Sequence, residues 1–337
     1  MAERFLRGIG VVAVLTPFVI GLTAAGADRN GEEVFRFQDS EIVESSGLVL
    51  EGDRAYTTND SGDTGRVFTV DTATGETTGV TFWADGPEDV EALAPAGPGH
   101  VWVADIGDNS ANRDSIEVTR VPVGDGDRTV DEETIDLVYP DGPRDAEALL
   151  VHPVTGRLYV ATKGFFGGEL YAAPPELADD APNMLGKVGD TSGIVTDGAF
   201  FPDGAHLILR TYTNAYVYSF PDLKSIGDFP LPAQEQGEGV AAMSSKDVYL
   251  SSEGQQAPVL KVPLPPEIRA ALLPKPYASL SVPAPTATAT EPEPQGGAKA
   301  VDDLAAAAAD RSVWWWVVSG LLSIGVVVVL LRAIRPR

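Results

Sequence analysis

The sequence predicts an all-β protein, a β-propeller of five four-stranded blades, on two observations. One pattern recurs five times between residues 45 and 262: an acidic or small polar residue, a short apolar run, a polar break and a second apolar run. The residues that open the repeats are spaced 41 to 56 residues apart, in the range of propeller blades, and are Ser46, Glu91, Glu147, Asp197 and Glu238. Short strand-like runs at this period favour a ring of four-stranded sheets.

Counting the strands of each repeat sets the number of blades. The first four repeats hold four apolar runs each, although the run at 184–189 is weak. The fifth repeat offers only 238–243, 247–252 and 259–264. Residues 32–37 form a strand-like run with no repeat of its own, so we expect this N-terminal strand to complete the fifth blade and close the ring. Six blades are the alternative, if the connection at 124–134 hides further strands.

The two ends of the chain carry apolar segments with different flanks. Residues 1–27 have Arg4 and Arg7, an apolar stretch and an Ala-Gly-Ala ending, which is typical of a secretory signal peptide; an uncleaved N-terminal anchor is the alternative. Residues 313–331 contain no charge and begin at three tryptophans, as expected of a transmembrane helix. The basic tail 332–337 should stay in the cytoplasm.

Between the repeats and this helix the composition changes. The propeller domain is expected over residues 28–273, and residues 274–312 are a Pro/Ala/Thr-rich acidic stretch that predicts an extended stalk. The predicted location is therefore the cell membrane, with a single pass, an extracellular domain and a cytoplasmic C-terminus.

Charge and cysteine content exclude several classes of function. The formal net charge is −25, which disfavours nucleic acid as a partner and suits solubility and cation binding. There is no cysteine, so the chain has no disulfide, no thiol nucleophile and no Cys-ligated zinc.

Polar residues gather at equivalent points of the predicted blades. The first strand of each blade should line the central channel, and the second strand runs antiparallel to it, so first-strand starts and second-strand ends share one mouth of the channel. The residues expected to bind a ligand there are Asn59, Asp60, Glu91, Asp105, Glu147, Lys163, Asp197, Arg210, Glu238 and Glu253. Acids crowded at one mouth repel each other unless a cation or a base lies among them.

Calcium is the expected cofactor, because it accepts about six to eight oxygen ligands in flexible geometry. Two acidic, glycine-rich loops at 59–65 and 105–109 directly follow strands and strengthen this hypothesis. Asx-turns without an ion are the alternative for both loops. The predicted metal ligands are Asp60, Asp63, Asp89, Glu91, Asp105, Asp108, Glu147 and Glu238.

Conventional catalysis finds little support in the sequence. There is no G-x-S-x-G motif, and His100, His152 and His206 are expected at the face opposite the acidic mouth. Any catalysis would have to use carboxylates, a bound metal ion and basic residues. The catalytic candidates are then Lys163, Arg210 and Glu147.

Eight motifs in order between residues 44 and 262 carry a resemblance: NDSGD, DVEALA, DIGDN, DAEALL, ATKG, LRTY, QGEGVA and SSEG. The series resembles that of a family of uncharacterised secreted bacterial β-propellers. It departs at Val90 and Ala92, where that family tends to have Trp and an acid. More distantly the chain resembles phytase-like esterase and calcium-dependent lactonase propellers. The resemblance implies the β-propeller fold and a polar channel mouth, but it does not imply a particular activity.

Two classes of function therefore remain open. The first is a cell-surface binding or scaffolding propeller, whose Ca²⁺-binding mouth takes a small ligand or a surface protein. The second is a Ca²⁺-dependent hydrolase of phosphate esters or lactones, in which the metal polarises the substrate and Lys163 and Arg210 stabilise the developing anion.

Overall fold

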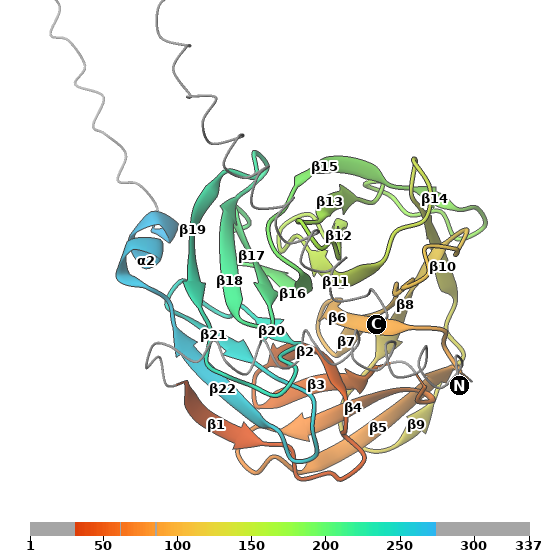
Figure 1. The fold of residues 1–337 in the computed structure, drawn as a ribbon. Helices are drawn as coiled ribbons and strands as arrows, with labels where there is room; N and C mark the ends of the chain where they lie inside the picture. Colours follow the sequence, from red (N-terminus) through yellow and green to blue (C-terminus); the bar gives the residue numbers. More distant parts are fainter. Residues whose placement is uncertain (1–30, 61, 85, 274–337) are drawn as a thin grey trace, which may run out of the picture. The chain divides into compact units, whose positions relative to one another are not determined.

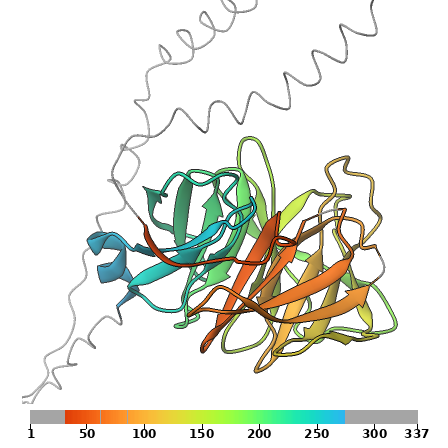
Figure 2. The ribbon, with the colours of Figure 1, turned by 90° about the horizontal axis from the view of Figure 1, so that it is seen from below.

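The ring is a five-bladed β-propeller, as the repeats predict. The structure, a computed structural model, describes residues 31–273 except 61 and 85. Five separate sheets surround a central channel, each with one strand against the channel and the others successively farther out (Figure 1). Seen from the side, the sheets stand next to one another around the ring (Figure 2).

Blades 1 and 2 each contain four antiparallel strands and one short added strand. Blade 1 comprises β2 (Ser45–Glu51), β3 (Arg54–Asn59), β4 (Gly65–Asp71), β5 (Thr77–Ala84) and β9 (Arg128–Thr129). Blade 2 comprises β6 (Val90–Pro95), β7 (His100–Asp105), β8 (Ile116–Pro122), β10 (Thr134–Val138) and β14 (Asn183–Met184).

The other three blades have four strands each. Blade 3 comprises β11 (Ala146–Val151), β12 (Leu158–Thr162), β13 (Glu169–Ala172) and β15 (Gly186–Asp190). Blade 4 comprises β16 (Val195–Phe200), β17 (His206–Thr211), β18 (Asn214–Ser219) and β19 (Ser225–Pro230). Blade 5 comprises β20 (Val240–Ala241), β21 (Asp247–Leu250), β22 (Pro258–Pro263) and β1 (Glu32–Arg36).

The N-terminal strand closes the ring, as predicted. β1 pairs antiparallel with β22, and the order in this sheet is β1-β22-β21-β20. Phe35 and Phe37 are buried against residues of blade 1, so the segment joins blades 5 and 1 by packing as well as by hydrogen bonds. In Figure 1, β1 and β22 lie side by side although they come from opposite ends of the described chain.

The six-bladed alternative is wrong. The connection between β8 and β10 does contain a strand, but this strand, β9, pairs in parallel with β5 of blade 1. Similarly, β14 lies in the connection between β13 and β15 of blade 3 but pairs in parallel with β10 of blade 2, while most of the weak run predicted for blade 3 forms β15. Both short strands extend existing blades across their boundaries, so each ties two neighbouring blades together without adding another.

The apolar core is divided among the five interfaces between blades. Each of the five buried clusters draws its side chains from two neighbouring blades. The inner strands are buried on both faces, which explains why β6 and β11 read as nearly continuous apolar runs with small alanines. The helix α2 (Pro266–Leu272), which was not predicted, buries Ile268 and Leu272 at the interface of blades 4 and 5.

A β-bulge recurs near the start of the inner strands, and it affects which side chains can point into the channel. The pairing of β6 with β7 skips Glu91, and the pairing of β11 with β12 skips Glu147. An equivalent bulge in β16 skips Thr196, and the register of β2 shifts between Ser46 and Val49. A bulged residue has no direct cross-strand neighbour, and bulges often re-aim a side chain near a site.

The predicted signal peptide, stalk, transmembrane helix and tail lie outside the described residues. Within residues 31–273, the structure contains no helix with the length and hydropathy needed to cross a membrane.

Candidate functional site

One face of the ring, called the channel mouth below, holds the starts of the inner strands and the ends of the second strands. The antiparallel register places them there: Val90 lies opposite Asp105 in blade 2, and Ala146 lies opposite Thr162 in blade 3. The three histidines begin or follow strands at the other face, as expected.

Three carboxylates from blades 1 and 2 meet at the mouth. Asp60 directly follows β3, Asp89 directly precedes β6, and Glu91 lies in the bulge of β6. One carboxylate oxygen of each lies within 4.8 Å of the other two, and Glu91 is buried. Burial and then the charge of Glu147 raise the pKa of Glu91 to about 11. At neutral pH this carboxyl therefore keeps its proton unless a cation replaces it.

Blade 3 contributes an ion pair beside these acids. The Lys163 ammonium binds a carboxylate oxygen of Glu147, and the Lys163 amide donates to the Asp145 carbonyl at 2.9 Å. Burial raises the pKa of Glu147 to about 7, although Lys163 opposes that shift. Burial by itself would lower the pKa of Lys163, but the charges of Glu147, Tyr212 and Glu91 and the hydrogen bond to Glu147 together raise it. This lysine is therefore a permanent positive charge at the mouth.

Blade 5 adds two more acids. Glu238 is buried, its Oε2 has no hydrogen-bond partner among the described residues, and burial followed by Glu147 and Glu253 raises its pKa well above the ordinary value. The Glu253 carboxylate accepts a hydrogen bond from the side-chain Nε2 of Gln236. Burial followed by the charge of Asp60 raises the pKa of Glu253 to about 7. The carboxyls of blades 1, 2, 3 and 5 therefore interact electrostatically across the mouth.

Tyr212 is a mouth residue that sequence reasoning missed. It directly follows β17 and is half-buried. Burial and then the charges of Glu238 and Glu147 raise its pKa, whereas Lys163 lowers it. Its position in the repeat could have indicated this role, because Tyr212 directly follows the second strand of blade 4 just as Lys163 directly follows that of blade 3.

Three predicted metal ligands accept hydrogen bonds from the protein itself, and those of Asp108 and Asp63 come from backbone amides of their own loops. Asp105 accepts from the Glu88 amide at 2.7 Å and the Asp89 amide at 3.0 Å, and it pairs with Arg113 at 2.6 Å. Asp108 accepts from two amides of the loop that follows it, both at 2.9 Å. Asp63 accepts from the Thr64 amide at 2.8 Å and from the side chains of Asn59 and Arg66. Their oxygens hold the loops in shape.

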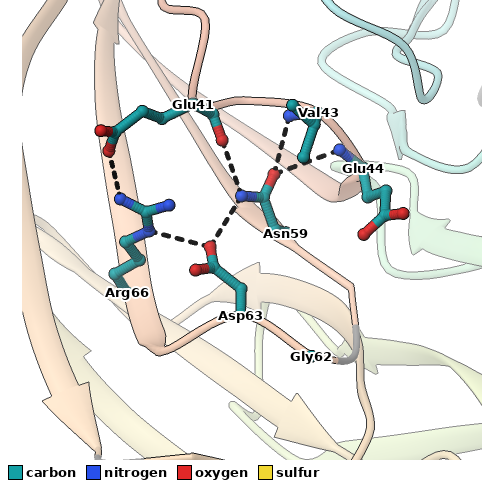
Figure 3. Close-up of a pocket in the computed structure, with 7 residues that line it drawn as sticks. All are labelled: Glu41, Val43, Glu44, Asn59, Gly62, Asp63 and Arg66. Carbon is teal, nitrogen blue, oxygen red and sulfur yellow. Dashed lines mark hydrogen bonds and ion pairs between the residues drawn. The ribbon is translucent and has the colours of Figure 1, made fainter.

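Asn59 is also engaged by its surroundings (Figure 3). Its Oδ1 accepts from the Val43 amide at 3.1 Å and the Glu44 amide at 3.2 Å, and its Nδ2 donates to the Glu41 carbonyl at 2.8 Å. These residues line a pocket of about 350 Å³ together with Asp63 and Arg66. Since the Gly254 amide donates to the carbonyl of Val43 at 2.8 Å, this pocket borders the blade 5 side of the mouth.

Arg210 is fully buried and joins blades 4 and 5. Its Nη1 donates to the Gly239 carbonyl at 2.7 Å and the Ser251 carbonyl at 2.8 Å, and its Nη2 donates to Gln234 at 3.0 Å. Burial lowers its pKa to about 10, although Glu238 opposes this. The guanidinium therefore stabilises the channel wall by hydrogen bonds, and it is not exposed to the solvent from which a substrate would bind.

The repeat alignment placed Asp197 at the position of Glu91 and Glu147, but in the structure it lies one residue beyond that position. The bulge of β16 falls at Thr196, so Thr196 is equivalent to Glu91 and Glu147, whereas Asp197 pairs with Arg210 in the ladder. The Asp197 carboxyl accepts from the Gly198 amide at 2.7 Å and from an amide of β20 at 2.6 Å. Burial raises its pKa well above the ordinary value despite these two bonds.

The comparisons with known proteins add little to this picture. No family model matches the chain, and no curated protein matches it. Among solved structures, the chain is similar to the PQQ-bound form of aldose sugar dehydrogenase from Streptomyces coelicolor, with 11% sequence identity and a TM-score of 0.41. That similarity covers 71% of this chain and 99% of the other chain.

Proposed function

We propose that this protein is a cell-surface binding module whose channel mouth holds Ca²⁺ on Asp60, Asp89 and Glu91. The observation that carries the proposal is the approach of these three carboxylates to within 4.8 Å of one another. Oxygen donors from two blades suit Ca²⁺, which accepts carboxylates in flexible geometry. Residues 274–312 would hold the propeller away from the membrane that residues 313–331 span.

The electrostatics of the mouth support a cation there. Burial and neighbouring carboxyls raise the pKa of Glu91 to about 11 and the pKa of Glu253 to about 7. A divalent cation offsets that repulsion and displaces the protons, because a bound ion is the largest local charge in such a site. The mouth as a whole has more acids than Lys163 alone can balance.

Calorimetric titration of Ca²⁺ into the wild type and two variants tests the proposal. We expect Asp60→Asn to weaken Ca²⁺ binding by at least about tenfold, the effect of losing about 1.4 kcal/mol of binding free energy. Asp222→Asn is the matched control, because Asp222 is an exposed acid in the β18–β19 connection, at the face opposite the mouth. Absence of binding heat in the wild type, with a melting temperature unchanged by chelator, would refute the proposal.

The pH dependence provides a second test. Glu147 and Glu253 have pKa values of about 7, and Glu91 has a higher one, so Ca²⁺ must displace protons to bind. The affinity should therefore rise with pH through neutrality. The enthalpy of binding should also depend on the ionisation enthalpy of the buffer. A Ca²⁺ affinity that does not change with pH would contradict the assignment of these carboxyls.

A second candidate is a Ca²⁺-dependent hydrolase of phosphate esters or lactones. The observation that favours it is the presence of the Lys163 ammonium, which pairs with Glu147, and of the Tyr212 hydroxyl, which interacts with Glu238 and Glu147 at the same mouth. A positive charge and a proton donor next to a metal could stabilise a developing anion. A screen of both substrate classes with Ca²⁺ tests this, and Tyr212→Phe and Lys163→Met should each abolish any turnover found. If the wild type turns over neither class of substrate, the hydrolase function is rejected and only the binding function remains.

A further inference from the structure

We propose that the β12–β13 loop is the docking surface for a partner protein, and that the partner contributes a segment with a basic side chain between apolar ones. The loop comprises residues 163–168 and has the sequence Lys-Gly-Phe-Phe-Gly-Gly. The inference rests on the proposed role of the channel mouth as a binding site, and it names the class of partner.

The loop exposes two adjacent phenylalanines. Phe165 is 82% exposed and Phe166 is 98% exposed, and their rings meet edge to face with centroids 5.0 Å apart. Exposed apolar side chains are common singly, but adjacent aromatic rings that protrude from the surface are typical of protein interfaces. The pair contributes little to the core, so its burial would be gained on binding.

Backbone geometry holds the pair in this position. A Cβ atom on Gly164 would lie 2.1 Å from the Gly167 carbonyl oxygen, and one on Gly168 would lie 1.9 Å from the Thr162 carbonyl oxygen. Gly167 has a φ of 118°, which L-residues with side chains rarely adopt. The Thr191 amide donates to the Gly168 carbonyl at 2.8 Å and anchors the end of the loop. A pre-organised loop loses little entropy on binding.

The loop borders the acidic mouth. Its first residue, Lys163, binds Glu147 there, so Phe165 is two residues away from a mouth side chain. The other connections between second and third strands have polar sequences at this face, apart from the aromatic ring of Tyr212 in the next blade. The mouth therefore offers carboxylates from blades 1, 2, 3 and 5, and aromatic rings from blades 3 and 4.

Charge and shape together favour a protein segment. The carboxylates attract a basic side chain, and the rings attract its apolar neighbours and can hold the cation by cation–π contact. Small ligands are usually enclosed by a cavity, whereas these rings stand out from the surface. A second copy of this chain, or an anionic membrane, would be repelled by the net charge of −25.

Selection from a phage-displayed library of random dodecapeptides on the full-length chain tests the inference. We expect enriched sequences to contain Lys or Arg next to aromatic or aliphatic residues. A synthetic peptide of the consensus, followed by fluorescence anisotropy, should bind at least about tenfold more weakly to the double variant Phe165→Ser/Phe166→Ser. Because both rings are exposed, the melting temperature of this variant should match that of the wild type. Higher ionic strength should weaken binding as well.

Val154→Ser is the matched control, since Val154 is 76% exposed and lies in the β11–β12 connection at the opposite face. Three results would overturn the inference: no enrichment over an unrelated protein, a consensus without basic residues, or equal weakening by Val154→Ser. Ca²⁺ titration of the same preparation separates the two proposals. Ca²⁺ binding without peptide binding removes only the docking surface, whereas loss of both removes the binding role of the mouth.

Discussion

At the scale of single residues, the inner-strand bulges decide which side chains reach the channel mouth. Glu91 and Glu147 occupy the bulges of β6 and β11, and both lack a direct partner in the ladder. Asp197 follows the bulge of β16, so its carboxyl turns into the interface of blades 4 and 5. A shift of one residue along a strand reverses the face on which a side chain lies.

The buried carboxyl of Glu91 makes the stability of the ring depend on pH. Its pKa is raised from 4.5 to about 11, so the folded state holds a proton that the unfolded state has lost. In chelator, the contribution of Glu91 to stability should be complete below pH about 4.5 and should be lost as pH rises toward 11. Glu91→Gln should flatten this dependence and raise the free energy of unfolding at pH about 8 by at least roughly 1 kcal/mol. Urea denaturation at several pH values measures it; parallel curves for both proteins would contradict the assignment.

Gly47 allows two inner strands to approach each other. Its φ is +76°, and a Cβ there would lie 2.3 Å from the Leu93 amide nitrogen. Gly52 also has a positive φ, +61°, but a Cβ there would meet nothing within 4 Å. We expect Gly47→Ala to lower the free energy of unfolding by about 1–3 kcal/mol more than Gly52→Ala does, because only the first adds a clash to the backbone strain. Equal losses, measured by chemical denaturation, would show that β2 and β6 can separate.

At the scale of elements, strands from both ends of the described chain are joined in one blade. β1 supplies the outer strand of blade 5, and β9 and β14 each cross from one blade to the next. Such links matter because a ring of separate sheets would otherwise depend on side-chain packing alone at its closing interface. They also leave fewer unpaired edges.

Deleting β1 should therefore weaken the ring at its closure. A chain that begins at Gln38 loses the pairing with β22 and the buried rings of Phe35 and Phe37. Burying one such side chain stabilises a fold by about 1.5–3 kcal/mol, so the melting temperature should drop by several degrees. A chain that begins at Gly31 is the control, because it keeps the whole strand. Equal melting temperatures would mean that β1 does not close the ring.

At the scale of the whole molecule, the acidic surface and the two apolar ends predict how the chain is displayed. We expect residues 28–312 to lie outside the cell and residues 332–337 inside, since the basic tail follows the predicted membrane segment. Protease added to intact cells should release a soluble fragment that contains the propeller, while a cytoplasmic marker stays intact. A chain that remains protected until the cells are lysed would contradict this orientation.

The sequence alone determined the number of blades and the closing strand, because alternating apolar runs and the repeat spacing are local properties. The runs at 247–252 and 259–264 become β21 and β22, with bounds that differ by at most two residues. Residues 32–37 were placed by counting, since only blade 5 lacked a strand. The helix α2 escaped prediction because a segment of seven residues with two buried side chains has too short an apolar period to detect.

Only the tertiary structure decided which polar residues share the mouth and which hold the frame together. Asp105 and Asp60 look alike in sequence, but Asp105 accepts hydrogen bonds from the Glu88 and Asp89 amides of the connection that precedes β6, whereas Asp60 lies with Asp89 and Glu91. Arg210 and Lys163 are basic residues near the ends of the second strands of adjacent blades, yet Arg210 is buried in the wall and Lys163 pairs with Glu147. The physical reason is that hydrogen-bond satisfaction and burial depend on neighbours from other blades, and a bulge of one residue is enough to exchange those neighbours.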